Sequence, residues 1–235
     1  MSALLAVRVC IASVVGLAAI GAAVAARPRG PAPRRILALG DSYTIGEGVP
    51  AADRWPVRLA ELLRGRAPAP AAPVIVARTG WTTDELATAI AARPPRGRFD
   101  LVTLLVGVNN QYRGRDLEEF RVQFRGLLAR AVTFAGGEAR RVIAVSIPDW
   151  GVTPFAQGRD RARIAAEIDA FNAVAREEAA RAGTRWADVT TLSRRHGADA
   201  RFLVADGLHP SGAAYAEWAA VISESLDAGR APTSR

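Results

Sequence analysis

The sequence predicts an α/β fold of three layers, α/β/α, built around a five-stranded parallel sheet. Short apolar runs alternate with longer segments of helical periodicity, which is typical of a parallel sheet covered by helices. The runs are almost continuously apolar, as expected when helices bury both faces of the sheet. The chain of 235 residues shows no strong break in composition, so one domain with one core is expected.

The expected strands and helices alternate along the chain. The strands are residues 35–39, 73–77, 100–106, 141–147 and 184–189. The helices lie at about 53–64, 82–92, 116–134, 159–182 and 211–228. Some helix ends carry signals of their own: Asp84 and Glu85 suit a first turn, Gly183 suits a left-handed cap, and Ser211 suits an N-cap.

A leader precedes the first strand. Residues 1–26 are interpreted as a signal peptide or membrane anchor, because residues 9–26 are apolar or small and end in a small-residue pattern that suits signal-peptidase cleavage. The rest of the chain divides into a Pro-, Arg- and Gly-rich linker (27–34), the domain (35–229) and a tail (230–235).

The leader favours export, to the periplasm or the medium, or membrane association through residues 9–26. Arginines at positions 27, 29, 34 and 35 favour a cytoplasmic body instead, by the positive-inside rule. Both interpretations stay open. A lipoprotein is not expected, because Arg8 lies just before Cys10, and this lone cysteine leaves the body without an internal disulfide.

Composition argues against two kinds of ligand. The net charge is +8, yet its cations are all arginines without a recognised nucleic-acid motif, so no nucleic-acid partner is expected. The two histidines, His196 and His209, have neither HExxH spacing nor neighbouring cysteines, so no metal is expected.

A serine stands in a glycine-rich turn directly after the first expected strand. Gly40 and an aspartate precede Ser42, and Gly46 and Gly48 follow it. Open α/β sheets gather their active sites at the carboxyl ends of their strands, where this serine would lie. Taken alone, a Gly-Asp-Ser turn is more often a solvated loop.

Three further segments fit the same edge of the sheet. Asp206 and His209 precede the last helix, and the acid can orient the imidazole toward a nucleophile. Gly80 follows the second strand and Asn109 the third. A backbone N–H at Gly80 and the Asn109 amide, together with the N–H of Ser42, would supply donors to an oxyanion. Each segment alone also suits a loop, a helix-entry glycine or an Asx turn.

Taken together, the order Ser, Gly, Asn and Asp-x-x-His resembles the SGNH subgroup of the GDSL hydrolases. The resemblance implies that Ser42 is the nucleophile, His209 the general base and Asp206 its partner. It also implies that Gly80 and Asn109 complete the oxyanion hole, in a flavodoxin-like domain that needs no metal or organic cofactor.

The resemblance covers roughly residues 35–225 and departs from the family pattern in two places. The third block usually reads Gly-x-Asn-Asp, but Asn110 stands in the last position here. The second block usually carries an asparagine before its glycine, where this chain has Arg78 and Thr79. We interpret both as subgroup differences that bear on the substrate.

Three aromatic residues complete the candidates. Trp81 and Trp150 follow expected strands and could line a pocket for the acyl or leaving group, although packing is the commoner role. His196 lies in a polar loop without an acid at a matching spacing, so a surface position is expected.

The predicted activity is hydrolysis of carboxylic esters, by a general esterase or lysophospholipase-like enzyme. Thioesters and O-acetyl groups on polysaccharides are alternative substrates, and a carbohydrate O-acetyl esterase of the cell envelope is the main rival. A non-catalytic binding module on the same fold belongs to a different class. An apolar pocket beside Ser42 would favour acyl chains, and an extended polar groove would favour glycans.

Overall fold

The computed structural model describes residues 34–65 and 68–227, and its centre is a five-stranded parallel sheet in the order β2-β1-β3-β4-β5. The strands are β1 (Ile36–Gly40), β2 (Val74–Ala77), β3 (Leu101–Leu105), β4 (Val142–Val145) and β5 (Arg185–Ala187). Gly40 pairs with Ala77 on one side and with Leu105 on the other. The carboxyl ends of these three strands therefore lie level with one another.

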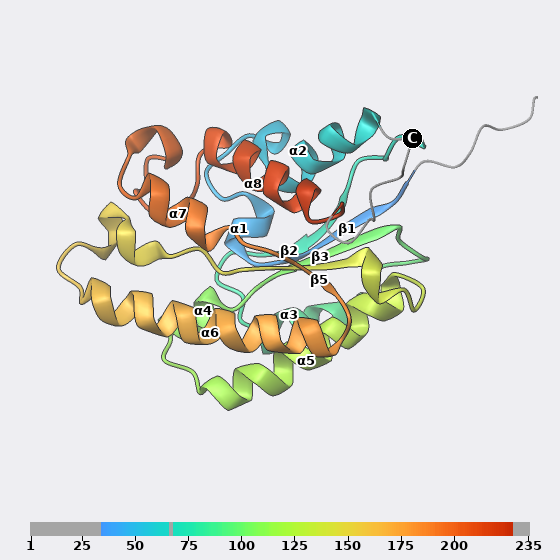
Figure 1. Cartoon of the computed structure of the whole chain (residues 1–235), viewed down its shortest axis with the longest axis horizontal. Helices are drawn as coiled ribbons and strands as arrows, with labels where there is room; N and C mark the ends of the chain where they lie inside the picture. The colour runs from blue at the N-terminus through green and yellow to red at the C-terminus, as the bar shows by residue number, and fades with distance from the viewer. Residues whose placement is uncertain (1–33, 66–67, 228–235) are drawn as a thin grey trace, which may run out of the picture. The chain divides into compact units, whose positions relative to one another are not determined.

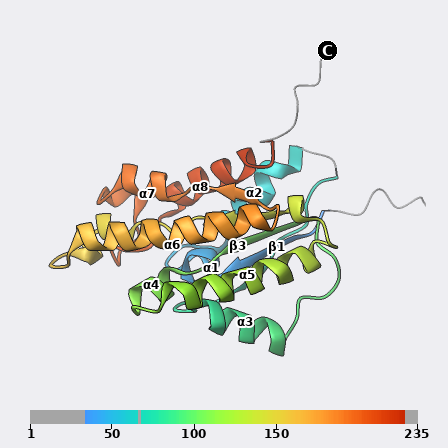
Figure 2. The same ribbon diagram turned by 60° about the horizontal axis from the view of Figure 1, so that its bottom comes forward.

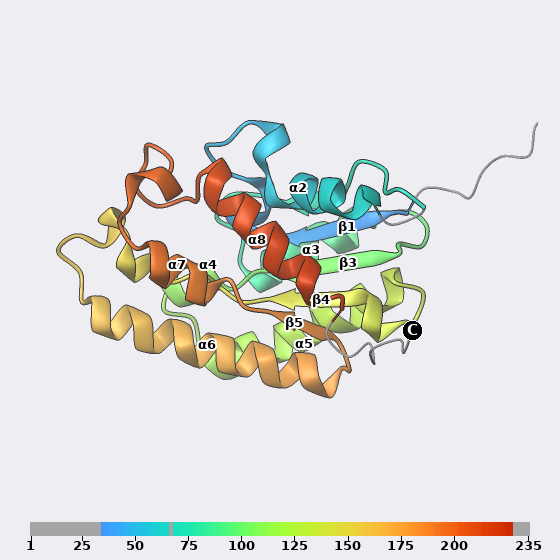
Figure 3. The same cartoon turned by 45° about the horizontal axis from the view of Figure 1, so that its top comes forward.

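Helices cover both faces of the sheet (Figure 1). They are α1 (Ser42–Ile45), α2 (Trp55–Leu62), α3 (Thr83–Ala92), α4 (Val108–Tyr112), α5 (Leu117–Phe134), α6 (Arg161–Arg181), α7 (Thr190–His196) and α8 (Gly212–Glu224). Short 3₁₀ turns are η1 (Ala51–Asp53), η2 (Leu63–Gly65), η3 (Ala139–Arg141), η4 (Trp150–Val152), η5 (Pro154–Ala156) and η6 (Ala200–Phe202). Figure 2 shows α3, α5 and α6 across one face, and Figure 3 shows α2 and α8 side by side on the other.

The predicted three-layer fold is confirmed, including all five strands. The central strands β1, β3 and β4 are buried at every residue, whereas the edge strands are only partly buried. This burial explains why the apolar runs showed no alternation. Two predicted helix signals are also found: Ser211 is the N-cap of α8, and Gly183 after α6 has a left-handed φ of 68°.

The structure differs from the prediction mainly in short elements. Helices α1, α4 and α7 were not expected, and the helix expected at 53–64 begins at Trp55 and ends in the 3₁₀ turn η2. Strand β1 keeps its predicted length but is shifted by one residue, and the other four strands are one to three residues shorter than the apolar runs, because the ladder ends before the apolar pattern does. The predicted leader and tail lie outside the described residues, as does the linker except for Arg34.

Gly40 allows the chain to turn sharply from β1 into α1. A Cβ atom at this position would overlap the Thr44 side chain and the Leu105 carbonyl oxygen. Only glycine fits so close a backbone approach. As a result, Ser42 lies directly after the carboxyl end of β1. Within residues 34–65 and 68–227, none of the helices has the length and hydropathy to cross a bilayer.

Candidate active site

Ser42 is the first residue of α1 and is held there by its neighbour. Asp41 caps the helix, and its carboxylate accepts a hydrogen bond from the Tyr43 N–H at 3.0 Å. Asp41 is completely buried, and this burial raises the pKa of its carboxyl group to about 7, although backbone N–H groups, including that of Tyr43, oppose the shift. Ser42 itself is only 5% exposed.

A cavity of about 190 Å³ opens on Ser42. It is lined by residues from the turns that follow β1, β2, β3 and β4, and from the loop before α8. The lining residues are Ser42, Tyr43, Thr79, Gly80, Val108, Asn109, Tyr112, Trp150, Phe155, Leu208 and His209. The structure thus brings Ser42, Gly80, Asn109 and His209, which are far apart in the sequence, to one cavity.

Asp206 holds His209 through two hydrogen bonds and binds the neighbouring Leu208 through a third. The imidazole Nδ1 lies 2.6 Å from Asp206 Oδ2, and the backbone N–H groups of Leu208 and His209 donate to Asp206 Oδ1 at 2.8 and 2.9 Å. Partial burial raises the pKa of Asp206, but these hydrogen bonds outweigh it and leave the pKa below its ordinary value. The acid therefore stays ionised and fixes the ring with Nε2 free to act on a substrate or nucleophile.

Ser42 and His209 face the same cavity without bonding to each other. In the part of the chain that the structure describes, no hydrogen bond joins the Ser42 hydroxyl to the His209 ring. Hydrogen bonds between nucleophile and base are often long in unliganded enzymes and shorten when substrate binds. The ring of Tyr43 packs beside His209, with centroids 5.4 Å apart, and limits where the imidazole can move.

The two expected oxyanion donors lie on neighbouring turns. Gly80 has a φ of 84°, which is the left-handed region that favours glycine, and its N–H donates no hydrogen bond among the described residues. Asn109 lies at the start of α4, and its amide Nδ2 donates one hydrogen bond to the Trp81 carbonyl at 2.9 Å. An amide nitrogen has two hydrogens, so one remains for a ligand.

Asn110, which replaces the usual aspartate, joins α4 to the start of α3. Its Oδ1 accepts from the Thr83 N–H at 3.1 Å, and its Nδ2 donates to the Thr83 hydroxyl at 2.7 Å. Both side chains are buried. The substitution therefore serves a structural contact, which no local sequence signal indicated.

Aromatic rings form one wall of the cavity. Of the two tryptophans that the sequence offers as pocket residues, Trp150 lies in this wall and Trp81 does not. Trp150 lines the cavity with Tyr112 and Phe155, and its indole N–H donates to Gln111 Oε1 at 2.8 Å. Trp81 does not line the cavity: its side chain packs against the core and its carbonyl accepts the Asn109 hydrogen bond. The expected pocket role of Trp81 is thus corrected.

A larger groove of about 640 Å³, lined by both apolar and charged side chains, shares Tyr112 and Trp150 of this wall with the cavity. Charged side chains from the loop after α4 and from the start of α6 line it, namely Arg115, Arg159, Asp160, Arg163 and Glu167. The cavity beside Ser42 is mainly apolar, whereas the groove is mixed. The apolar pocket expected for acyl chains therefore lies beside Ser42, whereas the groove does not reach Ser42 itself.

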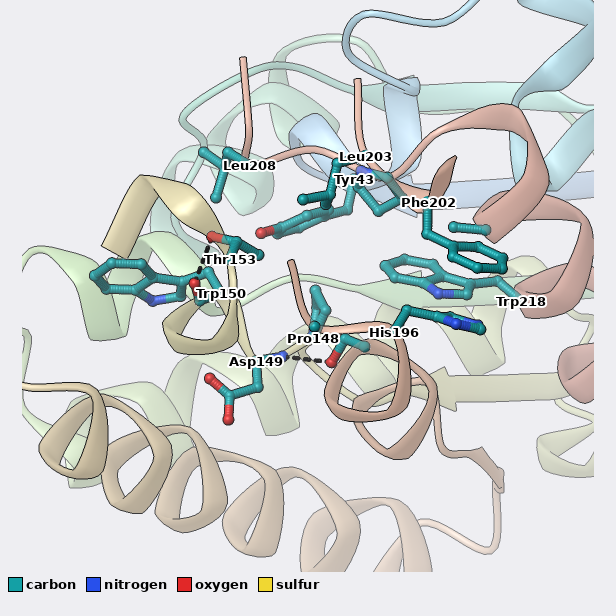
Figure 4. Close-up of a pocket in the computed structure, with 14 residues that line it drawn as sticks. Tyr43, Pro148, Asp149, Trp150, Thr153, His196, Phe202, Leu203, Leu208 and Trp218 are labelled. Atoms are coloured by element: carbon teal, nitrogen blue, oxygen red, sulfur yellow. Dashed lines mark hydrogen bonds between the residues drawn. The ribbon is translucent and has the colours of Figure 1, made fainter. Parts of the chain in front are cut away.

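The surface position expected for His196 is wrong. The ring is partly buried, stacks on Phe202 with centroids 3.5 Å apart, and has its Nε2 2.7 Å from a Glu217 carboxylate oxygen. Figure 4 shows it at one end of a second, small cavity of about 30 Å³, with Trp150 at the other end and Tyr43 between them. His196 therefore does not face Ser42, and its acid partner comes from α8, 21 residues away in the sequence.

Among the residues that the structure describes, no three aspartate, glutamate, histidine or cysteine side chains gather in a way that could hold a metal ion. The chemistry available at the cavity is that of a hydroxyl, an imidazole with its acid, and uncommitted N–H donors. Such a set can form and stabilise an acyl intermediate.

Comparison with known proteins agrees with this arrangement. The sequence profile of the GDSL-like Lipase/Acylhydrolase family matches residues 38–217, well over half of the chain. The chain belongs to this family. Its members are lipases and acylhydrolases, so an ester substrate is the general expectation for a GDSL-like acylhydrolase such as this one. No curated protein matches the chain.

Solved structures share the fold of this GDSL-like acylhydrolase at low sequence identity. TesA is 21% identical with a TM-score of 0.62, over 83% of this chain and 99% of that one. A lipase/acylhydrolase from Enterococcus faecalis is 21% identical with a TM-score of 0.60, over 86% and 100%. Axe2, an acetylxylan esterase from Geobacillus stearothermophilus, is 17% identical with a TM-score of 0.62, over 82% and 94%.

Proposed function

We propose that this protein is a serine hydrolase that cleaves carboxylic esters, with Ser42 as nucleophile, His209 as general base and Asp206 as the acid that orients His209. The observation that carries the proposal is that His209, bound to Asp206 through Nδ1 at 2.6 Å, lines the same small cavity as Ser42. Membership of a lipase and acylhydrolase family supports it independently.

The reaction proceeds through an acyl-enzyme. His209 Nε2 takes the Ser42 proton as the serine oxygen bonds to the ester carbonyl carbon, and the carbonyl oxygen becomes an oxyanion. The N–H groups of Ser42 and Gly80 and the Asn109 amide donate to that oxyanion. As the tetrahedral intermediate collapses, the alcohol leaves with the proton from His209. Water then gives a proton to His209 and bonds to the acyl carbon; the bond from that carbon to the serine oxygen breaks, the carboxylic acid leaves, and His209 returns the proton to Ser42.

The cavity supports a small apolar acyl group as the preferred substrate. At about 190 Å³ it is smaller than the roughly 300–1,000 Å³ of pockets that bury drug-sized ligands. Val108, Leu208 and the aromatic wall give it an apolar lining. We therefore expect kcat/KM on aryl esters to be highest for short chains and to fall once the acyl chain exceeds the cavity.

The test combines active-site labelling with turnover. A fluorophosphonate should label the wild-type protein on Ser42, and Ser42→Ala should lose both labelling and hydrolysis of 4-nitrophenyl acetate through octanoate. Ser223→Ala, in α8 and away from the cavity, is the matched control and should keep both. A folded wild-type protein that is neither labelled nor active on any ester or acetylated glycan contradicts the proposal and favours a binding module.

A carbohydrate O-acetyl esterase is the second candidate, and the charged side chains of the groove beside the aromatic wall favour it. The fold similarity to an acetylxylan esterase is consistent with this activity. Release of acetate from acetylated xylan at a higher kcat/KM than from 4-nitrophenyl acetate would select it. A preference for butyrate or hexanoate esters would select the general esterase.

A further inference from the structure

Two consecutive carbonyl groups on the Gly80 turn accept hydrogen bonds from one short helix. Arg113 Nη2 donates to the Gly80 carbonyl at 2.6 Å, and Asn109 Nδ2 donates to the Trp81 carbonyl at 2.9 Å. Asn109 lies in α4 and Arg113 is the C-cap residue one turn later, since the Arg113 N–H donates to the Asn109 carbonyl at 3.1 Å. The two segments that carry the proposed oxyanion donors are thus joined by side chains of α4 and of its C-cap residue.

Arg113 also reaches the first turn of α3. Its Nη1 lies 3.3 Å from Glu85 Oε1, while Glu85 Oε2 accepts from the Thr82 N–H at 2.9 Å in a capping box. About two fifths of both charged side chains is exposed, so this ion pair adds little stability by itself. Its effect is to hold the guanidinium in place over the Gly80 carbonyl.

The Gly80 turn needs such a restraint. Glycine has no side chain to limit φ and ψ, and Gly80 takes a φ of 84°. An oxyanion donor is effective only when its N–H already points to where the negative charge develops. The short, charge-assisted hydrogen bond from Arg113 fixes the carbonyl of this residue, and so restrains ψ of Gly80 and the turn that carries its N–H beside the cavity.

We propose that Arg113 is a positioning residue of the oxyanion hole, which acts through Gly80 without touching the substrate. This inference rests on the proposed function. A residue of this kind lowers the energy of the transition state more than that of bound substrate, so its loss should reduce kcat and leave KM nearly unchanged.

The test compares Arg113→Gln with Arg130→Gln. Arg130 is a matched control, because it is another exposed arginine that donates to a backbone carbonyl, that of Ala87 in α3 at 2.9 Å, and it does not line the cavity. On 4-nitrophenyl acetate, Arg113→Gln should lose about ten- to a hundredfold in kcat, less than complete removal of a donor costs, with KM within about threefold. Arg130→Gln should match the wild type.

Two further measurements separate positioning from a general structural effect. Arg113→Lys, which can still reach the Gly80 carbonyl, should recover part of the lost kcat. The combined variant Arg113→Gln with Asn109→Ala should lose less than the product of the two single losses, because both changes weaken one oxyanion hole. Circular dichroism and thermal unfolding check folding, and Arg113→Lys carries the test if Arg113→Gln does not fold.

The possible failures are distinguishable. An active wild type whose Arg113→Gln variant keeps kcat within twofold, or loses it only through KM, contradicts the positioning role and leaves the proposed function intact. The same holds if the losses of Arg113→Gln and Asn109→Ala simply multiply. A folded wild type that hydrolyses no ester and does not react with a fluorophosphonate contradicts both proposals.

Discussion

His209 and Asp206 lie three residues apart and meet through both side chain and backbone, so that the carboxylate accepts from the ring Nδ1 and from the His209 N–H. The carboxylate thereby sets the loop conformation and the ring orientation together. Gly207 between them has a φ of 67°, which lets the chain make this tight turn.

The two histidines should differ sharply when each is replaced by alanine. His209→Ala should lower kcat/KM by about a thousandfold or more, as expected for loss of the general base. His196→Ala should keep nearly full activity, because that ring pairs with Glu217 outside the catalytic cavity. Steady-state kinetics at one pH, with circular dichroism for folding, check this. An inactive His196→Ala with an active His209→Ala would reverse the assignment.

The activity of Asp206→Asn should lie between that of His209→Ala and that of His196→Ala. Its amide oxygen can still accept from the N–H groups of Leu208 and His209, so the loop conformation survives. The negative charge that stabilises the imidazolium is lost, and the ring is oriented less well. We expect kcat to fall while thermal unfolding changes little. Activity equal to that of the wild type would show that the backbone alone holds His209.

Asn109→Ala should lower kcat by on the order of a hundredfold, with a smaller effect on KM, because the amide donates to charge that develops only in the transition state. The substitution should also remove the hydrogen bond that this amide donates to the Trp81 carbonyl, so that the position of the carbonyl is less well fixed. Thermal unfolding of the variant measures that structural part separately. An unchanged kcat would assign Asn109 to the turn alone.

Asp41 should make the protein less stable as pH rises. Burial raises the pKa of its carboxyl group from 3.8 to about 7, so between these values the folded state holds a proton that the unfolded state has released. Stability from this group is therefore greatest below about pH 4 and is lost as pH rises through 7, by up to about 4 kcal/mol. Asp41→Asn, which keeps an N-cap acceptor, should remove this loss.

Urea unfolding at pH 5 and pH 8 checks the Asp41 prediction. The wild type should lose more unfolding free energy between the two values than Asp41→Asn does. Equal losses in the two proteins would show that Asp41 titrates in the folded state as it does in the unfolded chain.

We propose that the protein is exported, and fractionation of a bacterial host tests this. The full chain should appear in the periplasmic or membrane fraction, because residues 9–26 have the pattern of a secretory leader. Mass spectrometry of the amino terminus separates cleavage from anchoring. A full-length product in the soluble cytoplasmic fraction would contradict export, and a chain shortened to begin at Pro33 should remain active.

Sequence reasoning predicted the parts that depend on local pattern. Apolar runs located the strands because burial on both faces leaves a continuous signal, and glycine-bounded blocks located Ser42, Gly80 and Asn109 because each follows a strand. Helices α1, α4 and α7 were missed, since α1 and α4 span little more than one turn and the short α7 shows too little periodicity to be recognised.

Contacts between segments that lie far apart in the sequence could not be predicted in this way. The acid partner of His196 comes from α8, and the partners of Arg113 and Asn110 lie in and before α3. These contacts form because of how the helices and the sheet pack in space, so the spacing of residues along the sequence does not predict them. Trp81 was misjudged for a related reason: its position after a strand was predicted, but the side to which its ring turns is decided by packing.

The direction of β1 has a practical consequence for handling the enzyme. Arg34 precedes the amino end of this strand and Ser42 follows its carboxyl end. The five residues of β1 between them (Figure 1) span about 17 Å at about 3.3 Å per residue. A resin or fusion partner coupled on the amino-terminal side of Arg34 therefore joins the domain at the edge of the sheet opposite the cavity. Immobilised in this way, the enzyme presents its cavity to the solution, where even a polymeric substrate can approach it.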